Sequence, residues 1–367
     1  MIKKISVKTK NNSYIINVGF NLFQTKKIFN SLHAGDRVLF ITDNTIPTEW
    51  KYEVLQCLLR QKIIVNIFNL PSGENHKNLN SVNLIISFLL KNFYDRNSKL
   101  IAFGGGVIGD ITGFVASIYQ RGISFLQIPT TLLAQVDASI GGKTGVNHIL
   151  GKNMVGTFWQ PDEVITNINF LSTLPRKELI SGLAEVIKYA ISFDFVFFEW
   201  LENNIDKILR LDPVSLSYCI EQCCLLKVKI VSLDEREENA RMLLNFGHTY
   251  GHAIEAYFKY SDWLHGEAIS VGMILAMKTA EQIGILHNQH TKRMIHLLQK
   301  SGLPIIPPAS MSSESYIQYM ERDKKNNLGN IQLVLPTAIG KLRIIKNIDK
   351  NIIISVVQSY NFTKTKS

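Results

Sequence analysis

The sequence predicts an α/β domain over residues 1–175, with a Rossmann-like parallel sheet, followed by an all-α domain over residues 176–367. Two observations predict this division. Short β-rich runs alternate with longer helical patterns as far as Pro175, and helical periodicity dominates after it. A chain of 367 residues with 46% hydrophobic and 19% charged residues is typical of a globular protein that can bury two cores.

The predicted strands of the first domain are short runs of buried type. They are Ile5–Lys8 and Tyr14–Val18, which form a hairpin, then Val38–Thr42, Ile63–Leu70, Leu100–Phe103, Ser124–Ile128 and Val164–Asn167. Helical patterns lie between them at Tyr52–Leu59, at Leu79–Asn92 and from the glycine-rich segment 104–110 to about Tyr119. This alternation indicates a parallel sheet with helices on both faces, and such sheets bind ligands beyond the carboxyl ends of their strands.

The second domain is predicted from apolar residues at helical spacing. The predicted helices are Arg176–Ile191, Phe195–Leu209, Pro213–Glu235, Leu243–Tyr257, Glu267–Ile283 and Thr291–Ser301. Two β-rich runs near the end, Ile331–Leu335 and Leu342–Ile345, predict one late hairpin.

The charge favours small anionic partners. The chain has 40 Lys and Arg against 30 Asp and Glu, a formal charge of +10. The basic residues are scattered singly, so we expect no nucleic-acid partner and consider substrate phosphate instead. The amino terminus has no signal-like apolar segment, and no apolar run approaches the length of a membrane span. We therefore expect a cytoplasmic protein without a membrane partner.

The four cysteines are too few for a disulfide framework. Cys219, Cys223 and Cys224 lie together among aliphatic residues, which indicates buried helix positions. Cys219 and Cys223 at helical spacing are the alternative metal ligands.

The segment 241–255 carries a polar stripe if it is helical, because residues three and four apart share a helix face. That face holds Arg241, Asn245, His248, His252 and Glu255. Two imidazoles one turn apart can chelate a divalent ion, and His265 can supply a third nitrogen. A solvated helix face with inert histidines is the alternative.

A second segment, Gly182–Lys188, offers a carboxylate. Glu185 and Lys188 lie three residues apart on one predicted helix face. Glu185 can complete a Glu-His-His zinc site that leaves one position open for substrate. An ion pair within the helix explains the same two residues equally well.

Residues 104–109 fit G-x-G-x-x-G directly after a predicted strand and before a predicted helix. Glycines let the backbone approach a pyrophosphate, whose charge the amides at the helix start meet. No acidic residue follows the next strand, where Gln127–Thr131 stand, so Asp43 or Glu74 would hold the ribose hydroxyls instead. A glycine-rich turn that only joins a strand to a helix is the alternative.

Gly141–Gly145 resembles a fragment of a phosphate loop. It lacks the four-residue spacer of a P-loop, so nucleoside triphosphate chemistry is not predicted. Asp137 precedes it, Lys143 lies within it, and Lys152 and Asn153 follow it. We interpret the stretch as a polar loop that offers cations to an anion. Independent surface lysines are the alternative, against which the clustering argues.

These segments belong to a longer ordered series of motifs. The series comprises Gly104–Asp110, Tyr119–Gly122, Gln127–Asp137, Gly141–Lys143, Gly151–Met154, Gly182–Lys188, Asp234–Glu237, Asn245–Glu255, Leu264–Glu267 and Arg322–Lys325. In these motifs, over nearly its whole length, the sequence resembles the family of 3-dehydroquinate synthases. The resemblance implies a dehydroquinate synthase-like fold, a homodimer, and an active site in the cleft between an NAD-binding α/β domain and a helical domain.

The resemblance also implies a reaction. The family converts 3-deoxy-D-arabino-heptulosonate 7-phosphate into 3-dehydroquinate and phosphate, with NAD reduced and then regenerated. A divalent ion, zinc or cobalt, lowers the pKa of the substrate hydroxyls for hydride transfer. Phosphate then leaves by elimination with its own oxygens as base, hydride returns, the ring opens, and an intramolecular aldol addition closes the carbocycle.

The family pattern assigns roles to residues of this chain. The implied metal ligands are Glu185, His248 and His265, and His252 becomes a catalytic group rather than a ligand. Arg241 and Lys227 would hold the substrate carboxylate. The implied phosphate contacts are Lys143, Asn153, Asn245, Lys324 (or Lys325) and the partner subunit's Arg121. The implied proton-transfer groups are Asp137, Lys188, His252 and Glu237.

The implied cofactor contacts fall in the first domain. They are Asp43, Ser72, Gly73, Glu74, Lys77, Gly105, Gly106, Val107, Ile108, Gly109, Asp110, Thr130, Thr131, Lys143, Lys152, Phe170, Leu171, Ser172 and Thr173.

Rival functions remain open on the sequence alone. Another sugar-phosphate cyclase would act on a substrate without the carboxylate that Arg241 and Lys227 would hold. A metal-dependent polyol dehydrogenase would release its reduced cofactor. A phosphate- or nucleotide-binding regulator would release no phosphate.

Overall fold

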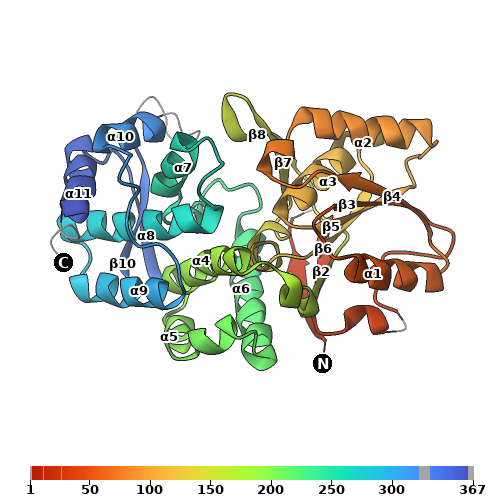
Figure 1. The fold of residues 1–367 in the computed structure, drawn as a ribbon, viewed down its shortest axis with the longest axis horizontal. Coiled ribbons are helices and arrows are strands. Elements are labelled where there is room, and N and C mark those ends of the chain that lie inside the picture. The colour runs from red at the N-terminus through yellow and green to blue at the C-terminus, as the bar shows by residue number, and fades with distance from the viewer. Residues whose placement is uncertain (1, 11, 26, 322–330, 363–367) are drawn as a thin grey trace. The chain divides into compact units, whose positions relative to one another are not determined.

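The computed structural model describes residues 2–10, 12–25, 27–321 and 331–362. The chain divides into two compact units (Figure 1). Unit 1 comprises residues 1–175 and 216–236, and unit 2 comprises residues 176–215 and 237–367. The sequence-based division after Pro175 assigns all of 216–236 to the second domain, whereas compactness groups this segment with unit 1.

Unit 1 is built on a seven-stranded sheet of order β1-β2-β9-β6-β5-β3-β4. The strands are β1 (Lys3–Lys8), β2 (Ser13–Gly19), β3 (Arg37–Asp43), β4 (Ile64–Leu70), β5 (Lys99–Gly104), β6 (Ser124–Pro129) and β9 (Glu163–Asn167). Strands β1 and β2 form the predicted antiparallel hairpin, and all other pairs are parallel. The predicted parallel sheet is confirmed.

Helices cover both faces of this sheet, because alternate residues of a strand point to opposite sides. Val38 and Phe40 of β3 belong to one buried cluster with Val54 of α1 (Thr48–Arg60). Leu39 and Ile41 belong to a second cluster that includes apolar side chains of α2 (Leu79–Lys91) and α3 (Gly106–Ile118). Each fully buried aliphatic or aromatic side chain contributes about 1.5–3 kcal/mol to folding.

Two further features of unit 1 follow β6. Ala134–Ala138 is a single π-helical turn, a geometry common at functional sites. The stretch interpreted as a polar loop is instead a hairpin of β7 (Lys143–His148) and β8 (Gly151–Phe158). Glycines at 145 and 156 hid the strand pattern. A Cβ on Gly145 would lie 2.5 Å from the Val155 carbonyl oxygen, so the two strands approach too closely for side chains there.

Unit 2 is mainly helical, with one late hairpin. Its helices are α4 (Arg176–Phe193), α5 (Phe195–Leu209), α7 (His248–Tyr257), α8 (His265–Gln282), α9 (Asn288–Lys300), α10 (Ser313–Glu321) and α11 (Lys350–Phe362). Strands β10 (Leu333–Ala338) and β11 (Lys341–Ile345) form the predicted hairpin. Helix α6 (Pro213–Leu233) has its first residues in unit 2 and the remainder in unit 1.

The predicted helix Leu243–Tyr257 is wrong at its start. Residues Ala240–Asn245 form a 3-10 helix, and α7 begins only at His248. Gly247 interrupts the helix because its φ of +78° is left-handed. A Cβ there would also lie 2.6 Å from Cγ of Met273 on α8. Arg241 and Asn245 therefore do not share a helix face with the histidines.

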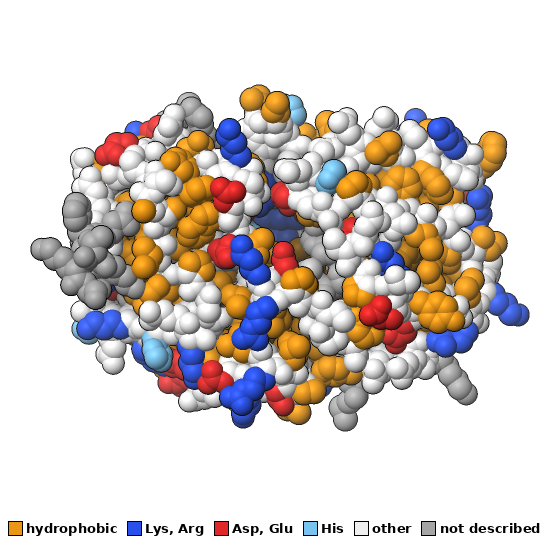
Figure 2. Space-filling view, viewed as in Figure 1, with side chains coloured by type: hydrophobic (Ala, Val, Ile, Leu, Met, Phe, Trp, Pro, Cys, Tyr) orange, Lys and Arg blue, Asp and Glu red, His pale blue; other side chains and the backbone are white. Residues whose placement is uncertain are grey.

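Basic side chains on the face in Figure 2 lie on several elements and are interspersed with acidic ones. Among the described residues, no helix combines the length and apolar character needed to cross a membrane.

Candidate active site

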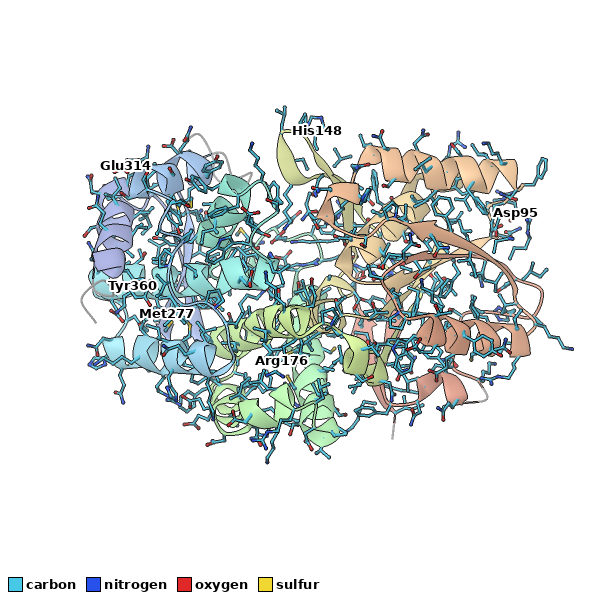
Figure 3. All side chains as sticks on the ribbon, viewed as in Figure 1. Asp95, His148, Arg176, Met277, Glu314 and Tyr360 are labelled. Carbon is cyan, nitrogen blue, oxygen red and sulfur yellow. The ribbon has the colours of Figure 1, made fainter. Side chains whose placement is uncertain are left out.

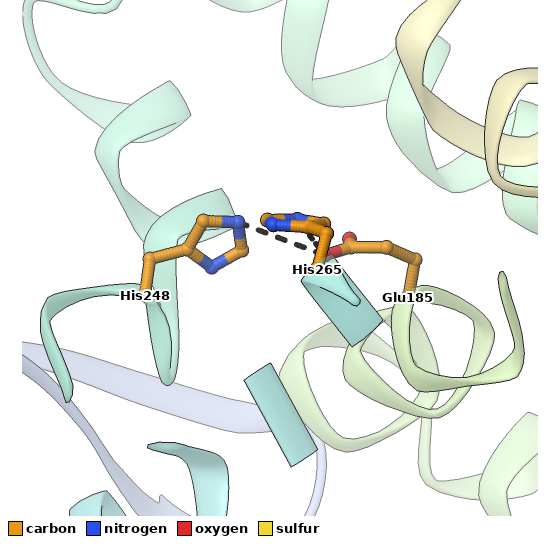
Figure 4. Close-up of side chains that lie close together, drawn as sticks. All are labelled: Glu185, His248 and His265. Carbon is orange, nitrogen blue, oxygen red and sulfur yellow. Dashed lines mark ion pairs between the residues drawn. The ribbon is translucent and has the colours of Figure 1, made fainter. Parts of the chain in front are cut away.

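Glu185, His248 and His265 lie together in unit 2 (Figure 4). One carboxylate oxygen and two imidazole nitrogens lie within 4.8 Å of one another. Nε2 of His248 is 3.6 Å and Nε2 of His265 is 3.5 Å from the same atom, Oε1 of Glu185. One carboxylate and two imidazoles are a donor set suited to zinc or cobalt with a position left open. The residues therefore fit a catalytic divalent ion.

The close approach of α8 to α4 brings two of these residues together. The Gly266 amide donates a hydrogen bond to Ser181 Oγ at 3.0 Å, and a Cβ on Gly266 would lie 1.9 Å from the Ser181 carbonyl oxygen. Only glycine fits this crossing. Glu185 lies one turn beyond Ser181, and His265 directly precedes Gly266, so the crossing places the carboxylate next to the imidazole.

Both histidines are held through the ring nitrogen that faces away from Glu185. His248 Nδ1 lies 3.2 Å from the Phe246 carbonyl oxygen, and His265 Nδ1 lies 3.2 Å from Oε1 of the buried Glu255. A proton on each Nδ1 leaves each Nε2 lone pair directed at the cluster. The structure thus gives Glu255 an orienting role that the sequence did not assign, although it lies on the polar stripe.

Lys188 and His252 lie beside this cluster. Lys188 is only 2% exposed and forms an ion pair with Glu185 across one helical turn. The intrahelical ion pair and the Glu-His-His arrangement therefore occur together and do not exclude each other. The His252 ring centroid is 5.3 Å from that of His248 and 6.5 Å from that of His265. His252 is not a member of the group of potential ligands.

The remaining candidates of unit 2 lie around the 3-10 helix Ala240–Asn245. Arg241 is 1% exposed, and a guanidinium is this deeply buried only where partners meet its charge. Asn245 Nδ2 donates to Glu237 Oε1 at 2.7 Å, so these two candidates lie together. Lys324 and Lys325 lie outside the described residues.

In unit 1, the candidate cofactor residues follow the carboxyl ends of parallel strands. Asp43 ends β3, Ser72–Glu74 follow β4, and Gly105 follows β5. Thr130 and Thr131 follow β6, and residues 170–173 lie in the 3-10 helix after β9. Because β3, β4, β5, β6 and β9 are parallel, these segments meet at one edge of the sheet, where sheets of this kind bind ligands.

The glycine-rich turn is closely packed against its neighbours. A Cβ on Gly105 would lie 3.1 Å from Thr131 Cγ2, and one on Gly109 would lie 2.7 Å from Gln127 Oε1. The Gly109 contact is with the far end of the Gln127 side chain, so it marks the close approach of α3 to β6. The turn therefore has both the position and the tight packing of a dinucleotide-binding turn.

Asp110 lies in α3, just after its first turn, beside a buried lysine. Lys77 Nζ lies 2.5 Å from Asp110 Oδ2 and 2.5 Å from Asn153 Oδ1. Burial raises the pKa of Asp110 above its ordinary value, and the Lys77 ammonium opposes this shift. The Lys77 ammonium thus joins two further candidates, Asp110 and Asn153, from separate segments of the chain.

Phe170 and Leu171 are among the predicted cofactor contacts whose side chains are not accessible. Phe170 is 2% exposed and its ring packs 5.4 Å from that of Phe103, while Leu171 is 1% exposed. Any contact they make with a nucleotide is therefore through the backbone.

Two other predicted cofactor contacts accept hydrogen bonds within unit 1. Thr173 Oγ1 accepts from Trp50 Nε1 at 2.7 Å, and Asp43 Oδ1 accepts from the Thr45 amide at 2.8 Å.

Asp137 and Lys227 are joined within unit 1. Lys227 Nζ of α6 donates to Asp137 Oδ1 at 2.6 Å and to the Asp137 carbonyl oxygen at 2.7 Å. The π-helical turn places this carboxylate, and the buried segment of α6 supplies the cation. Lys143 and Arg121 are exposed, and Lys152 is partly exposed.

All four cysteines are buried thiols that form no disulfide. None belongs to the group of potential metal ligands among the described residues. Burial raises the pKa of Cys224 to about 12, which disfavours the thiolate that a metal needs. The prediction of buried helix positions for Cys219, Cys223 and Cys224 is confirmed.

Solved structures that match nearly the whole chain identify the class of fold. A 2-deoxy-scyllo-inosose synthase complexed with carbaglucose-6-phosphate, NAD+ and Co2+ matches with a TM-score of 0.88 at 25% identity, over 98% of this chain and 100% of that one. A 2-epi-5-epi-valiolone synthase from Streptomyces hygroscopicus subsp. jinggangensis with NAD+ and Zn2+ bound matches with a TM-score of 0.90 at 25% identity, over 97% and 99%. The chain thus has a dehydroquinate synthase-like fold.

Sequence comparison identifies the family within this class. The family model for the 3-dehydroquinate synthase N-terminal part matches residues 67–181, and the model for the C-terminal part matches residues 182–326. A 3-dehydroquinate synthase of Buchnera aphidicola subsp. Baizongia pistaciae is 53% identical over 95% of this chain and 98% of its own length. The chain belongs to the 3-dehydroquinate synthase family.

Proposed function

We infer that this chain converts 3-deoxy-D-arabino-heptulosonate 7-phosphate into 3-dehydroquinate and phosphate. Membership of the 3-dehydroquinate synthase family, at 53% identity over 95% of the chain, supports this substrate and product. The observation that carries the activity is the convergence of Glu185, His248 and His265, since the reaction needs an ion that can bind substrate hydroxyls.

NAD and a divalent ion are the cofactors of this function. When bound, NAD accepts and returns a hydride and the ion lowers the pKa of the substrate hydroxyls. We assign the ion to the Glu185, His248 and His265 cluster and NAD to the sheet edge after β3, β4, β5, β6 and β9. Two solved structures of similar fold contain NAD+ with Co2+ or Zn2+, which supports this pairing.

The chain's own residues orient the substrate and move protons. We propose that Arg241 and Lys227 hold the substrate carboxylate, because a buried guanidinium grips a carboxylate in two places. Phosphate contacts are assigned to Lys143, Asn153, Asn245, Lys324 and the partner subunit's Arg121. Proton-transfer roles are assigned to Asp137, Lys188, His252 and Glu237. Lys188 forms an ion pair with Glu185, and Lys227 forms one with Asp137, which supports their assignment as groups held in place near the reacting atoms.

We propose that the reaction is a carbon–oxygen lyase step within a cyclisation, in a homodimer. Elimination breaks the bond between carbon and the phosphate ester oxygen. The proton of the neighbouring carbon passes to an oxygen of the leaving phosphate, so no external base is required. After this loss of phosphate, the remaining carbon skeleton returns to the oxidation level of the substrate when the hydride that it gave up earlier is restored.

The test is an assay on purified protein with the heptulosonate phosphate, catalytic NAD and zinc. Phosphate and dehydroquinate should form in equal amounts, with no net NADH. Accumulation of NADH would instead indicate a polyol dehydrogenase. Turnover of a cyclase substrate that lacks the carboxylate, with none of the heptulosonate phosphate, would indicate another sugar-phosphate cyclase.

A further inference from the structure

Asn147 lies at an irregular position of the β7–β8 hairpin. Regular pairing stops at Val146 opposite Val155 and resumes at His148 opposite Gly151, so the single residue Asn147 of β7 lies opposite three residues of β8, 152–154. This irregularity bends β8 and interrupts the ladder, which leaves the backbone and side chain of Asn147 available for other partners. His148, labelled in Figure 3, marks the nearby tip of this hairpin.

The freed backbone of Asn147 pairs with another segment. Its amide donates to the Lys77 carbonyl oxygen at 2.8 Å, and Asn147 forms an isolated parallel bridge with Asn78. The hairpin is therefore attached to the segment after β4, which carries Glu74 and Lys77.

The side chain of Asn147 uses both ends of its amide. Nδ2 donates to Glu74 Oε1 at 2.8 Å, and Oδ1 accepts from the Asn153 backbone amide at 2.8 Å. Asn153 has a left-handed φ of +53°, a conformation that asparagine adopts more readily than most residues other than glycine. Asn147 thus fixes a candidate cofactor carboxylate on one side and a candidate phosphate ligand on the other.

A second link runs parallel to the first. Lys77 Nζ contacts Asn153 Oδ1 and Asp110 Oδ2, each at 2.5 Å. Lys77 is 4% exposed, so this ammonium cannot move freely to solvent. A displacement of Asn153 therefore reaches Glu74 through Asn147 and reaches Asp110 through Lys77.

We propose that Asn147 is a positioning residue that couples nucleotide binding to phosphate binding in unit 1. This inference rests on the proposed function, which assigns Glu74 to the nucleotide and Asn153 to the substrate phosphate. A nucleotide that orders Glu74 also orders Asn153, because one planar amide holds both. Binding of either ligand then favours the other by the same factor.

The chemistry of the two contacts explains why the residue is asparagine. Aspartate keeps the acceptor for the Asn153 amide but presents an oxygen, instead of a donor, to the Glu74 carboxylate. Alanine removes both contacts. Asn147→Asp therefore disturbs only the contact with Glu74, whereas Asn147→Ala removes the contacts with both Glu74 and Asn153.

The experiment titrates NAD into the zinc-loaded full-length protein by calorimetry, with and without saturating inorganic phosphate. In the unchanged protein, phosphate should tighten NAD binding by about fivefold or more. In Asn147→Ala that factor should fall to about one. In Asn147→Asp the Kd for NAD should rise about tenfold, while the Kd for phosphate alone should change less than about twofold.

Ile149→Ala is the matched control, because Ile149 is 94% exposed at the tip of the same hairpin. It should leave both dissociation constants and their coupling unchanged. A coupling factor in Asn147→Ala equal to that of the unchanged protein would overturn the proposal. If Asn147→Ala does not fold, unchanged NAD affinity in Asn147→Asp would overturn it. Absence of dehydroquinate formation by the unchanged protein would contradict the proposed function separately, since these titrations need no turnover.

Discussion

His248 and His252 lie one turn apart on α7, but only His248 has an imidazole nitrogen near Glu185 Oε1 in the group of potential ligands. Loss of a residue that only hydrogen-bonds to a metal ligand lowers metal affinity by roughly 10–100-fold. We expect His248→Ala, which removes a ligand, to lower metal affinity by more than this. His252→Ala should keep its metal and lose activity, because its assigned role is proton transfer. Metal content after dialysis, measured by atomic absorption, distinguishes the two, and equal metal loss would contradict the ligand assignment.

Glu255 acts on the cluster through His265. Its Oε1 lies 3.2 Å from His265 Nδ1, and removal of its charge weakens the hold on the ring. Glu255→Gln should lower zinc affinity by about 10–100-fold, measured by competition with a chromophoric chelator.

Glu281→Gln is the control for this substitution. Glu281 pairs with Lys278 at 2.8 Å near the end of α8, the helix that begins at His265. Its zinc affinity should equal that of the unchanged protein. A zinc affinity of Glu255→Gln equal to that of this control would refute the orienting role of Glu255.

At the scale of elements, the start of α7 depends on Gly247. An alanine there is strained by a left-handed φ, at about 1–2 kcal/mol, and overpacks against Met273, at about 1–3 kcal/mol. Gly247→Ala should therefore destabilise unit 2 by about 2–5 kcal/mol and lower metal content, since His248 is the next residue.

Gly284→Ala separates strain from overpacking. Gly284 has a similar φ of +75°, but its Cβ would meet no atom within 4 Å. Gly284→Ala should lower the free energy of unfolding by only about 1–2 kcal/mol and leave metal content unchanged. Chemical unfolding and metal analysis of both variants check this. An equal loss of unfolding free energy in Gly247→Ala and Gly284→Ala would show that contact with Met273 is unimportant.

The elements also show what sequence patterns can and cannot predict. Strand runs such as Val38–Thr42 and helices such as Phe195–Leu209 were predictable, because their apolar periodicity agrees with their burial. The break at Gly247 was not, because it depends on the approach of α8, which no local pattern contains. The β7–β8 hairpin was missed for a similar reason, since glycines at its closest contact removed the alternation.

For the site, the sequence indicated the residue types but not their arrangement. The resemblance to a family supplied the set Glu185, His248 and His265, whereas periodicity alone favoured a stripe that includes Arg241 and Asn245. Asn147 and the role of Glu255 were not predictable, because each is defined by contacts between segments distant in sequence.

At the scale of the whole molecule, the proposed homodimer predicts complementation. Arg121→Ala and His248→Ala should each be inactive alone, since one lacks a phosphate contact and the other a metal ligand. After unfolding together and refolding at equal concentrations, mixed dimers should recover up to about a quarter of the normal sites, because each mixed dimer contains one complete site. No recovery, with mixed dimers demonstrated by differential tagging, would place Arg121 in its own subunit's site.

The path of the chain has a consequence for how this protein can be taken apart. The backbone passes from one compact unit to the other after Pro175, returns after Ser215 and passes again after Arg236. No single cut therefore yields two self-sufficient fragments, and a chimaera spliced at Pro175 would combine α6 from one parent with a sheet from the other. Exchange of parts between relatives requires the 216–236 segment to travel with the amino-terminal half.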